Sequence, residues 1–315
     1  MSDSTLAFVF PGQGSQKVGM LTAAHAQFAT VRDTFAEASA ALGYDMWALV
    51  QSGPQESLNL TATTQPVLLT SSVALWRAWQ ENSDIRPSIM AGHSLGEFSA
   101  LVCAGALAFT DAVQLVRQRG EFMQTAVPIG EGAMAAIIGV DDEDVNRICA
   151  EVAASQDGVV SAVNFNSPGQ VVIAGHTAAV GLAIDALKAA GAKRAMPLPV
   201  SAPFHTELMR PAGERLAEVI AEINIAAPEV PVVHNVQAAL EPDPAQIRKL
   251  LVEQIYSPVK WTSCVQTIIA SGVTNIVECG PGKVLSGLNR RIDKSLRSFS
   301  LEEPDGLQAA AAELA

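Results

Sequence analysis

The sequence is poor in the residues that build disulfide frameworks and zinc sites. Its 315 residues include only four cysteines, and none of these forms a C-x-x-C pair or has a histidine nearby (Cys103, Cys149, Cys264 and Cys279). Structural zinc sites need paired cysteines or histidines at short spacing, so this sparseness argues against one. It predicts reduced thiols in a cytosolic protein.

Long apolar runs are also missing. No stretch approaches the roughly 18 consecutive apolar residues that span a bilayer. The first ten residues have no basic start and only a five-residue apolar run, so they make a poor signal peptide. We therefore expect a soluble, cytoplasmic protein that does not bind membranes.

Basic residues are outnumbered: 20 Lys and Arg stand against 32 Asp and Glu, which gives a formal net charge of -12. Such a chain repels phosphate backbones on average, which argues against nucleic acid and anionic membranes as general partners. Charged residues make up only 17% of the sequence and hydrophobic residues 49%. That balance predicts a globular protein with a sizeable core.

Strand and helix patterns alternate through most of the chain. Short apolar runs at residues 6–10, 87–91 and 275–278 each end in a glycine-containing turn. Helical patterns are predicted at 21–42, at 67–80 with Pro66 in the first helical position, and up to about residue 125 after an N-cap at Thr110-Asp111. Further helices are predicted near 207–223, 245–256 and 262–271, and a docked or frayed helix at 302–315. The fold class is therefore α/β.

The middle of the chain has a different order. Strand patterns at 133–138, 159–164, 170–174 and 193–196 enclose helical patterns at 141–154 and 178–190. This β-α-β-β-α-β order is typical of ferredoxin-like units. It predicts a ferredoxin-like subdomain over residues 130–198, inserted into an α/β-hydrolase-like domain formed by 1–129 and 199–315.

The segment Gly92-His93-Ser94-Leu95-Gly96 fits G-x-S-x-G between an apolar strand and an apolar helix. In that context the turn lifts a nucleophilic serine above the sheet, and the helix start favours a developing oxyanion. Short patterns of this kind also occur in plain glycine-rich loops, so the flanking strand and helix decide in favour of Ser94 as a nucleophile.

A serine nucleophile needs a base, and the chain has five histidines (His25, His93, His176, His205 and His234). His93 adjoins Ser94 but should point away from it in a tight turn. His25 and His176 lie at predicted helix starts, where solvated or capping roles are usual. His205 follows an irregular junction segment, which favours it only mildly over His234.

Two further features are open to a plain and a functional interpretation. Gln13, in the turn after the first strand, is placed to offer a backbone N–H to an oxyanion together with Leu95, or the turn has no function. Arg117 and Arg119 lie in one helix, where arginines are usually solvated but could also clamp a substrate carboxylate. Spacing does not decide between the two.

Seven ordered segments resemble one known family. They are Phe10-Pro11-Gly12-Gln13-Gly14-Ser15-Gln16, Gly92-His93-Ser94-Leu95-Gly96-Glu97, Arg117-Gln118-Arg119-Gly120, Asn164-Phe165-Asn166-Ser167-Pro168-Gly169-Gln170, Pro203-Phe204-His205, Gln254-Ile255-Tyr256-Ser257-Pro258-Val259-Lys260-Trp261 and Glu278-Cys279-Gly280-Pro281-Gly282-Lys283. The chain resembles the malonyl-CoA:acyl carrier protein transacylases of dissociated bacterial fatty-acid synthesis, over residues 6–299.

The resemblance implies a role for each matching residue. Ser94 would be the acyl-accepting nucleophile and His205 its base, with the backbone carbonyl of Gln254 orienting the histidine. Gln13 and Leu95 would form the oxyanion hole, and Arg119 would hold the malonyl carboxylate. Asn166 would support the site, and Phe204 correlates with malonyl over methylmalonyl substrates.

The resemblance also implies the reaction and its partners. It implies ping-pong transfer of malonyl from malonyl-CoA to the phosphopantetheine thiol of holo-acyl carrier protein, by a monomer with no cofactor of its own. A serine hydrolase or thioesterase is the main alternative, with Asp141 or Asp185 as candidate third residues. A non-catalytic carrier-docking subunit is a further alternative, although it would need none of the catalytic residues.

Five of the basic residues gather near the end of the chain (Lys283, Arg290, Arg291, Lys294 and Arg297). Such runs are usually solvated helix faces. Because carrier proteins are acidic, we expect Lys283, Arg290 and Arg291 to dock the carrier, helped by Lys193 and Arg194.

Overall fold

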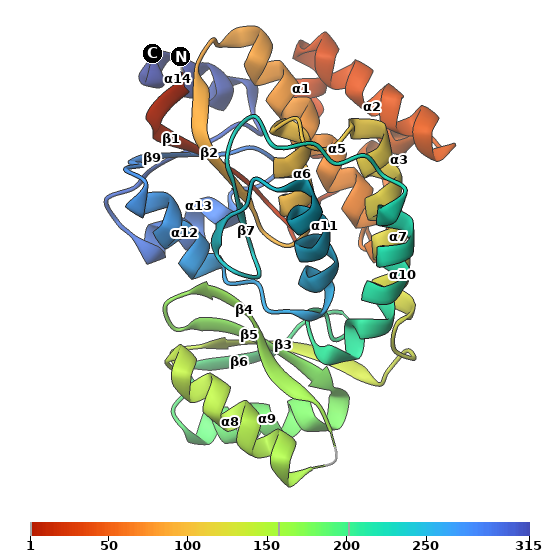
Figure 1. The fold of residues 1–315 in the computed structure, drawn as a ribbon, viewed down its shortest axis with the longest axis vertical. Helices are drawn as coiled ribbons and strands as arrows, with labels where there is room; N and C mark the ends of the chain where they lie inside the picture. The colour runs from red at the N-terminus through yellow and green to blue at the C-terminus, as the bar shows by residue number, and fades with distance from the viewer. Residues whose placement is uncertain (1, 157, 201) are drawn as a thin grey trace.

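The computed structural model describes residues 2–156, 158–200 and 202–315. Two β-sheets lie one above the other, a larger one surrounded by most of the helices and a smaller one with two helices on its outer side (Figure 1). The two chain ends lie close together on the larger part, away from the smaller sheet (Figure 1).

The larger sheet has six strands in the order β10-β9-β1-β2-β7-β8. Neighbouring strands are parallel except for the β7–β8 pair. The strands are β1 (Ser2–Phe10), β2 (Arg86–Gly92), β7 (Val232–His234), β8 (Ala239–Leu240), β9 (Asn275–Glu278) and β10 (Arg297–Ser300).

Both faces of the larger sheet are covered, which explains the continuous apolar run in β1. Leu6, Phe8 and Phe10 belong to one core cluster, whereas Ala7 and Val9 belong to another on the opposite face. Successive strand residues point to opposite faces, so a strand buried on both sides needs apolar residues at every position.

The helices of the larger part come from the chain before and after the segment that forms the smaller sheet. They are α1 (Thr22–Gln27), α2 (Ala29–Leu42), α3 (Met46–Ser52), α4 (Gln55–Leu58), α5 (Thr61–Asn82), α6 (Leu95–Cys103), α7 (Phe109–Thr125), α10 (Arg210–Ala221), α11 (Pro244–Glu253), α12 (Trp261–Ala270), α13 (Val284–Ile292) and α14 (Pro304–Leu314). Short 3-10 turns precede α10 at Glu207–Met209 and follow α11 at Gln254–Tyr256.

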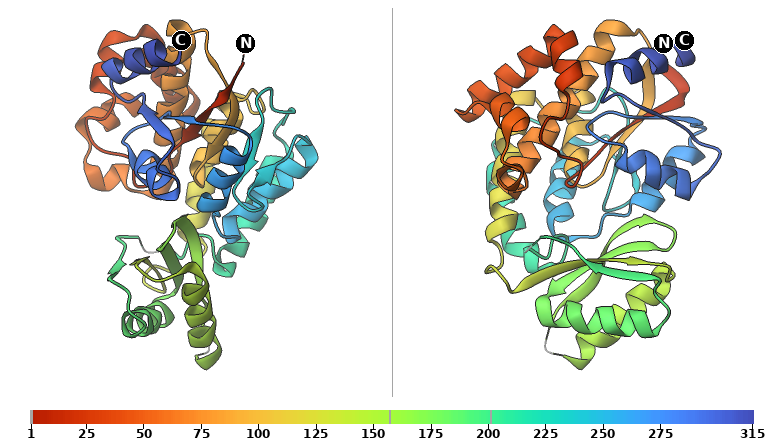
Figure 2. Two further views of the ribbon diagram at one scale, coloured as in Figure 1. Left: turned by 90° about the vertical axis from the view of Figure 1, so that its left-hand side faces the viewer. Right: turned by 180° about the vertical axis from the view of Figure 1, so that it is seen from behind.

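The smaller sheet has the strand order β4-β5-β3-β6 and is antiparallel. It is built from β3 (Gly132–Ile138), α8 (Asp142–Ser155), β4 (Val160–Ser167), β5 (Gln170–His176), α9 (Thr177–Ala189) and β6 (Arg194–Pro197). Both helices lie on the face turned away from the larger part (Figure 2). Ala135 and Ile173 pack in the core cluster on that side, whereas Met134 and Val172 belong to the core of the larger part.

Three local predictions were wrong. Pro66 lies inside α5 and not at its start, and the N-cap of α7 is Ala108 and not Thr110-Asp111. The predicted helix over 21–42 is two helices, because Phe28 adopts an extended conformation between α1 and α2. In α5 most residues are buried, so packing outweighs the local cost of a proline within the helix.

The C-terminal segment forms a docked helix: Leu307 and Ala310 of α14 are fully buried in the main core. Among the described residues, no helix combines the length and the apolar character that a membrane crossing requires.

Candidate active site

Ser94 stands at a sharp turn between β2 and α6. Its backbone dihedrals are φ 51° and ψ -105°, a conformation that L residues rarely adopt. A Cβ on Gly92 would lie 1.8 Å from the carbonyl carbon of Gly96, and one on Gly96 would lie 2.0 Å from the carbonyl oxygen of Phe10. Glycine is therefore required on both sides of the serine for the turn to close.

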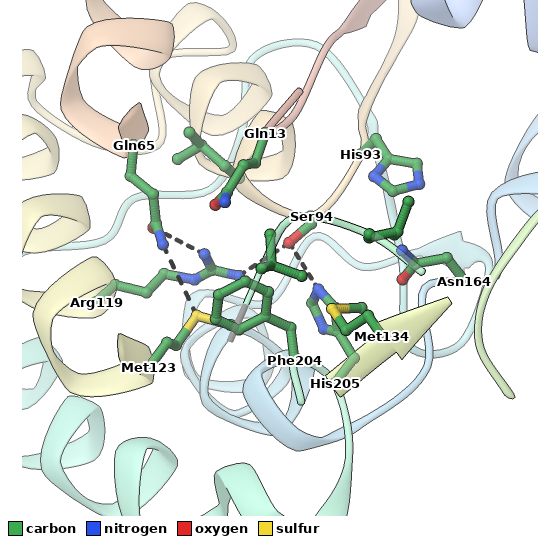
Figure 3. Close-up of a pocket in the computed structure, with 13 residues that line it drawn as sticks. Gln13, Gln65, His93, Ser94, Arg119, Met123, Met134, Asn164, Phe204 and His205 are labelled. Carbon is green, nitrogen blue, oxygen red and sulfur yellow. Dashed lines mark hydrogen bonds between the residues drawn. The ribbon is translucent and has the colours of Figure 1, made fainter. Parts of the chain in front are cut away.

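His205 contacts the serine hydroxyl. Its Nε2 lies 2.9 Å from Ser94 Oγ (Figure 3). Its Nδ1 lies 2.8 Å from the backbone oxygen of Gln254. Since a carbonyl only accepts, Nδ1 carries the proton and Nε2 is left to accept from the hydroxyl. Burial and, next, the cation of Arg119 lower the pKa of His205 to about 3, so the ring is neutral at pH 7.

Arg119 of α7 brings a buried guanidinium to the same hydroxyl. Its side chain is 1% exposed. Nη2 donates to Ser94 Oγ at 3.1 Å, and Nη1 donates to Gln65 Oε1 at 2.8 Å (Figure 3). Nη2 also donates to Gln254 Oε1 at 2.8 Å. Burial lowers the pKa of Arg119 to about 10, so it stays cationic at neutral pH. Within the described residues its Nε has no hydrogen-bond partner.

Arg117 lies in the same helix but outside the site. It pairs with Glu121 at 3.2 Å and donates to the backbone oxygen of Leu42 at 3.3 Å. Its side chain is 43% exposed. Of the two arginines that spacing left undecided, only Arg119 reaches Ser94.

A cavity of about 120 Å³ opens beside Ser94, between the two sheets. This volume suits a short acyl group better than a long chain. The lining residues come from both parts of the molecule: Gln13, Gln65, His93, Ser94, Leu95, Arg119, Met123, Met134, Asn164, Leu198, Val200, Phe204 and His205 (Figure 3).

Gln13 and Leu95 both line this cavity. Leu95 is the first residue of α6, so its N–H has no carbonyl to bond within the helix. Gln13 is exposed in the turn after β1. Their action as an oxyanion hole stays a prediction.

The other histidines face different partners. His93 Nε2 lies 2.8 Å from Asn166 Oδ1, so the ring beside Ser94 is held by the smaller sheet. His176 accepts from the backbone N–H of Val159 at 3.0 Å. The prediction for His25 was wrong: it lies near the end of α1, and its ring stacks on Trp47 at 3.6 Å because an apolar surface is available there.

His234 ends β7, as its sequence context allowed, and donates from Nδ1 to Glu97 Oε1 at 2.8 Å. Both side chains are fully buried. Burial would lower the pKa of His234, but the hydrogen bond and charge of Glu97 raise it. This histidine therefore bonds Glu97, behind the site, and does not contact Ser94.

Sequence reasoning missed the polar residues behind Ser94. Asn235 Oδ1 accepts from Ser94 N at 2.7 Å, and its Nδ2 donates to the backbone oxygen of Gly92 at 2.7 Å, which holds the turn. Glu97 is fully buried one helical turn after Ser94. The signal for Glu97 was a charged residue within an otherwise apolar helical pattern. Gln65 gave no such signal, because it lies in the polar run before the predicted helix.

The predicted docking residues lie on α13 and its approach. Lys283 and Arg290 are exposed, and Arg290, Arg291 and Lys294 line a surface depression with Gly287. Arg291 also donates to Gln170 Oε1 of the smaller sheet. Arg297 is engaged elsewhere, since it pairs with Glu313 of α14 at 2.6 Å.

Known proteins that are similar in sequence and solved structures that are similar in fold are of the same kind. Residues 7–303 match the acyl transferase domain family. Malonyl CoA-acyl carrier protein transacylase of Salmonella typhimurium is 60% identical over 304 residues, which cover 96% of this chain and 98% of that protein. The protein of the same name from Bacillus subtilis is 47% identical over 307 residues, which cover 98% and 96%.

Two solved structures superpose over nearly the full chain. An acyl carrier protein S-malonyltransferase from Vibrio cholerae has a TM-score of 0.95 and 55% identity, covering 97% of this chain and 99% of that one. A malonyl-transacylase solved in complex with a type II PKS acyl-carrier protein has a TM-score of 0.96 and 54% identity, covering 98% and 99%. This chain is an acyltransferase that belongs to the acyl transferase domain family and, within it, to the malonyl CoA-acyl carrier protein transacylases.

Proposed function

We propose that this chain transfers a malonyl group from malonyl-CoA to the phosphopantetheine thiol of acyl carrier protein, through a malonyl-Ser94 intermediate. The observation that carries the proposal is the buried Arg119 guanidinium 3.1 Å from Ser94 Oγ, at a cavity of about 120 Å³. A cation so close to the nucleophile fits a short acyl group with a free carboxylate at its far end. The names of the relatives agree with this substrate.

In the first half-reaction, Ser94 Oγ attacks the thioester carbon of malonyl-CoA while its proton passes to His205 Nε2. Backbone N–H groups of Gln13 and Leu95 stabilise the oxyanion of the tetrahedral intermediate. When the intermediate collapses, the C–S bond breaks and His205 returns the proton to the CoA sulfur. CoA then leaves, and malonyl remains on Ser94 as an ester.

In the second half-reaction, the carrier thiol gives its proton to His205 and attacks the malonyl ester. The C–O bond to Ser94 breaks, and the proton returns to Ser94 Oγ. The backbone carbonyl of Gln254 keeps the His205 ring oriented through both halves, in the place where a hydrolase has a carboxylate. The candidate acids Asp141 and Asp185 are not needed for this arrangement.

Arg119 supplies the selectivity. An acetyl group leaves the buried cation without an anionic partner, whereas malonyl provides one. Arg119→Ala should therefore remove most of the preference for malonyl-CoA over acetyl-CoA and keep some transfer of the neutral acyl group. Equal loss of both transfer rates would contradict the clamp. Phe204, which lines the cavity, correlates with malonyl over methylmalonyl use.

The covalent intermediate is tested by mass spectrometry. Incubation with malonyl-CoA should add one malonyl group at Ser94, and the adduct should persist until holo-acyl carrier protein is added. Ser94→Ala should show no adduct and no transfer. Rapid release of malonate without a carrier would instead indicate a hydrolase, and undiminished transfer by Ser94→Ala would indicate a docking subunit.

We further propose how the chain is divided. Residues 1–129 and 199–315 form an α/β-hydrolase-like domain, and 130–198 form an inserted ferredoxin-like subdomain. The β3-α8-β4-β5-α9-β6 order and the β4-β5-β3-β6 sheet support the second assignment, and the strand-turn-helix geometry at Ser94 supports the first.

The working state and the docking surface complete the proposal. The enzyme acts in the cytoplasm as a monomer with no bound cofactor. Size-exclusion chromatography of the purified protein tests the monomeric state. The carrier protein docks on Lys283, Arg290 and Arg291, helped by Lys193 and Arg194. The exposure of these basic side chains supports this surface.

A further inference from the structure

A fully buried carboxylate lies behind Ser94 and takes no direct part in the steps above. Glu97 and its three neighbours His234, Asn235 and Gln254 are all fully buried. We propose that Glu97 is a positioning residue that acts through the Gln254 side chain to hold Arg119 in place for the acyl carboxylate before the substrate binds. The inference rests on the proposed function and deepens it.

The Glu97 carboxylate accepts three hydrogen bonds. Its Oε1 accepts from His234 Nδ1 at 2.8 Å, and its Oε2 accepts from Asn235 N at 2.9 Å and from Gln254 Nε2 at 2.8 Å. A buried carboxylate is costly unless such donors surround it. Three donors from β7, the segment after it and the turn after α11 therefore fix the carboxylate firmly.

The Gln254 side-chain amide lies between Glu97 and Arg119. On one side it faces the Glu97 carboxylate, which only accepts, and on the other the Arg119 guanidinium, which only donates. Only one orientation satisfies both, with Nε2 toward Glu97 and Oε1 toward Arg119 Nη2. Nε2 also donates to the backbone oxygen of Ser94 at 3.0 Å, so Glu97 is one of two acceptors that keep the amide N–H groups turned away from the guanidinium, and it is the charged one.

The charge of Glu97 also acts on Arg119. Burial lowers the pKa of Arg119, and the negative charge of Glu97 raises it again, so Glu97 favours the cationic form of the clamp. Glu97 thus supports Arg119 both by geometry and by charge.

The base is held separately from this relay. His205 Nδ1 is bound to the backbone oxygen of Gln254, not to its side chain. Any effect of Glu97 on the Ser94 turn, through Asn235 or through the Gln254 Nε2 that donates to Ser94 O, would slow all acyl groups alike. The ratio of malonyl to acetyl transfer therefore isolates the effect on Arg119.

The test compares kcat/KM for malonyl-CoA and for acetyl-CoA in three variants of the full chain. Glu97→Gln should lower the malonyl-to-acetyl ratio about tenfold, the size expected when a hydrogen bond to a charged group is lost. Gln254→Ala should lower it similarly. The double variant should lose no more than the larger single loss, because both changes break one relay.

The matched control is Glu278→Gln. Glu278 is also fully buried, but it accepts from the backbone N–H and hydroxyl of Ser286 and from Leu285 N at the start of α13. This variant should lose stability and keep the ratio. A ratio change equal to that of Glu97→Gln would show a general packing effect and overturn the inference.

An unchanged ratio in Glu97→Gln would also overturn it. If Glu97→Gln does not fold, an unchanged ratio in Gln254→Ala has the same force, since the relay passes through that side chain. Arg119→Ala separates the two proposals. If it keeps the malonyl preference, the clamp itself fails; if it loses the preference while Glu97→Gln keeps it, only the role of Glu97 fails.

Discussion

Single residues around Ser94 owe their charge states to burial. His205 is buried next to a cation, and both conditions oppose a second proton on the ring. Arg119 is just as buried but keeps its charge, because its ordinary pKa is far above neutral. The site thus holds a neutral imidazole and a cation side by side, which is the pair that the proposed attack of Ser94 on an anionic acyl group would use.

The charge state of His205 predicts the pH dependence of acylation. With a pKa of about 3 in the folded free enzyme, the base stays unprotonated well below the ordinary value of 6.5. The kcat/KM for Ser94 malonylation should therefore stay nearly constant from pH 8 to about pH 5. Rapid-quench mass spectrometry would measure this kcat/KM. A kcat/KM that falls to half its plateau value near pH 6.5 and continues to fall below that pH would contradict the prediction.

The same shift affects stability in a defined direction. The unfolded chain protonates this histidine near pH 6.5, whereas the folded chain does so only near 3. Between these values the unfolded state binds more protons, so this residue's contribution to the free energy of unfolding falls as the pH is lowered from about 6.5.

At the scale of elements, two contacts between backbones fix the site. The turn at Ser94 lies against the end of β1, where His93 N donates to the backbone oxygen of Phe10 at 3.0 Å. The smaller sheet is tied to the segment before α12: Phe165 N donates to Val259 O at 3.0 Å, and Val259 N donates to Val163 O at 2.8 Å. These bonds hold Met134 and Asn164 over the cavity.

The close approach of α6 to β1 predicts a large effect of one methyl group. Gly96→Ala would place a Cβ 2.0 Å from the backbone oxygen of Phe10, and neither backbone can move without opening the site. We expect a loss of about 3 kcal/mol or more in the free energy of unfolding, measured by urea denaturation, together with loss of Ser94 malonylation.

Gly181→Ala is the matched control for that change. Gly181 lies in α9 with nothing within 4 Å of the added Cβ. The free energy of unfolding of Gly181→Ala should rise by about 0.5–1 kcal/mol, because alanine has less backbone freedom to lose on folding than glycine. A similar loss in both variants would contradict the packing argument.

For the whole molecule, the distribution of charge matters more than its sum. The net charge of -12 would repel an acidic carrier. The exposed cluster of Lys283, just before α13, and Arg290 and Arg291 in α13 has the opposite sign. It lies where the larger part meets the smaller sheet, since Arg291 bonds Gln170.

Charge reversal tests this surface. Arg290→Glu with Lys283→Glu should raise the KM for holo-acyl carrier protein about tenfold at low salt, by the loss of electrostatic attraction, and less at high salt. Ser94 malonylation by malonyl-CoA should be unchanged. The control is Arg147→Glu with Lys188→Glu, on the outer helices α8 and α9 of the smaller part. Its effect on the carrier KM should be smaller, and an equal effect would refute the α13 surface.

The sequence by itself determined the local features. Periodicity predicted β1, β2, β9 and the order of the middle segment, because these signals are carried by neighbouring residues. The glycines around Ser94 marked the turn for the same reason. The helix starts predicted at Pro66 and at Thr110 were wrong, because burial of the whole helices outweighed local capping preferences.

Only the tertiary structure decided which distant side chains meet. It brought His205, and not His234, to Ser94, and Arg119, and not Arg117, although each pair looked alike in sequence. It also joined Glu97 to Gln254, which are 157 residues apart. The physical reason is that these contacts depend on how α6, α7 and the turn after α11 pack together. Such packing joins segments far apart in the chain, so the local sequence around each residue does not determine it.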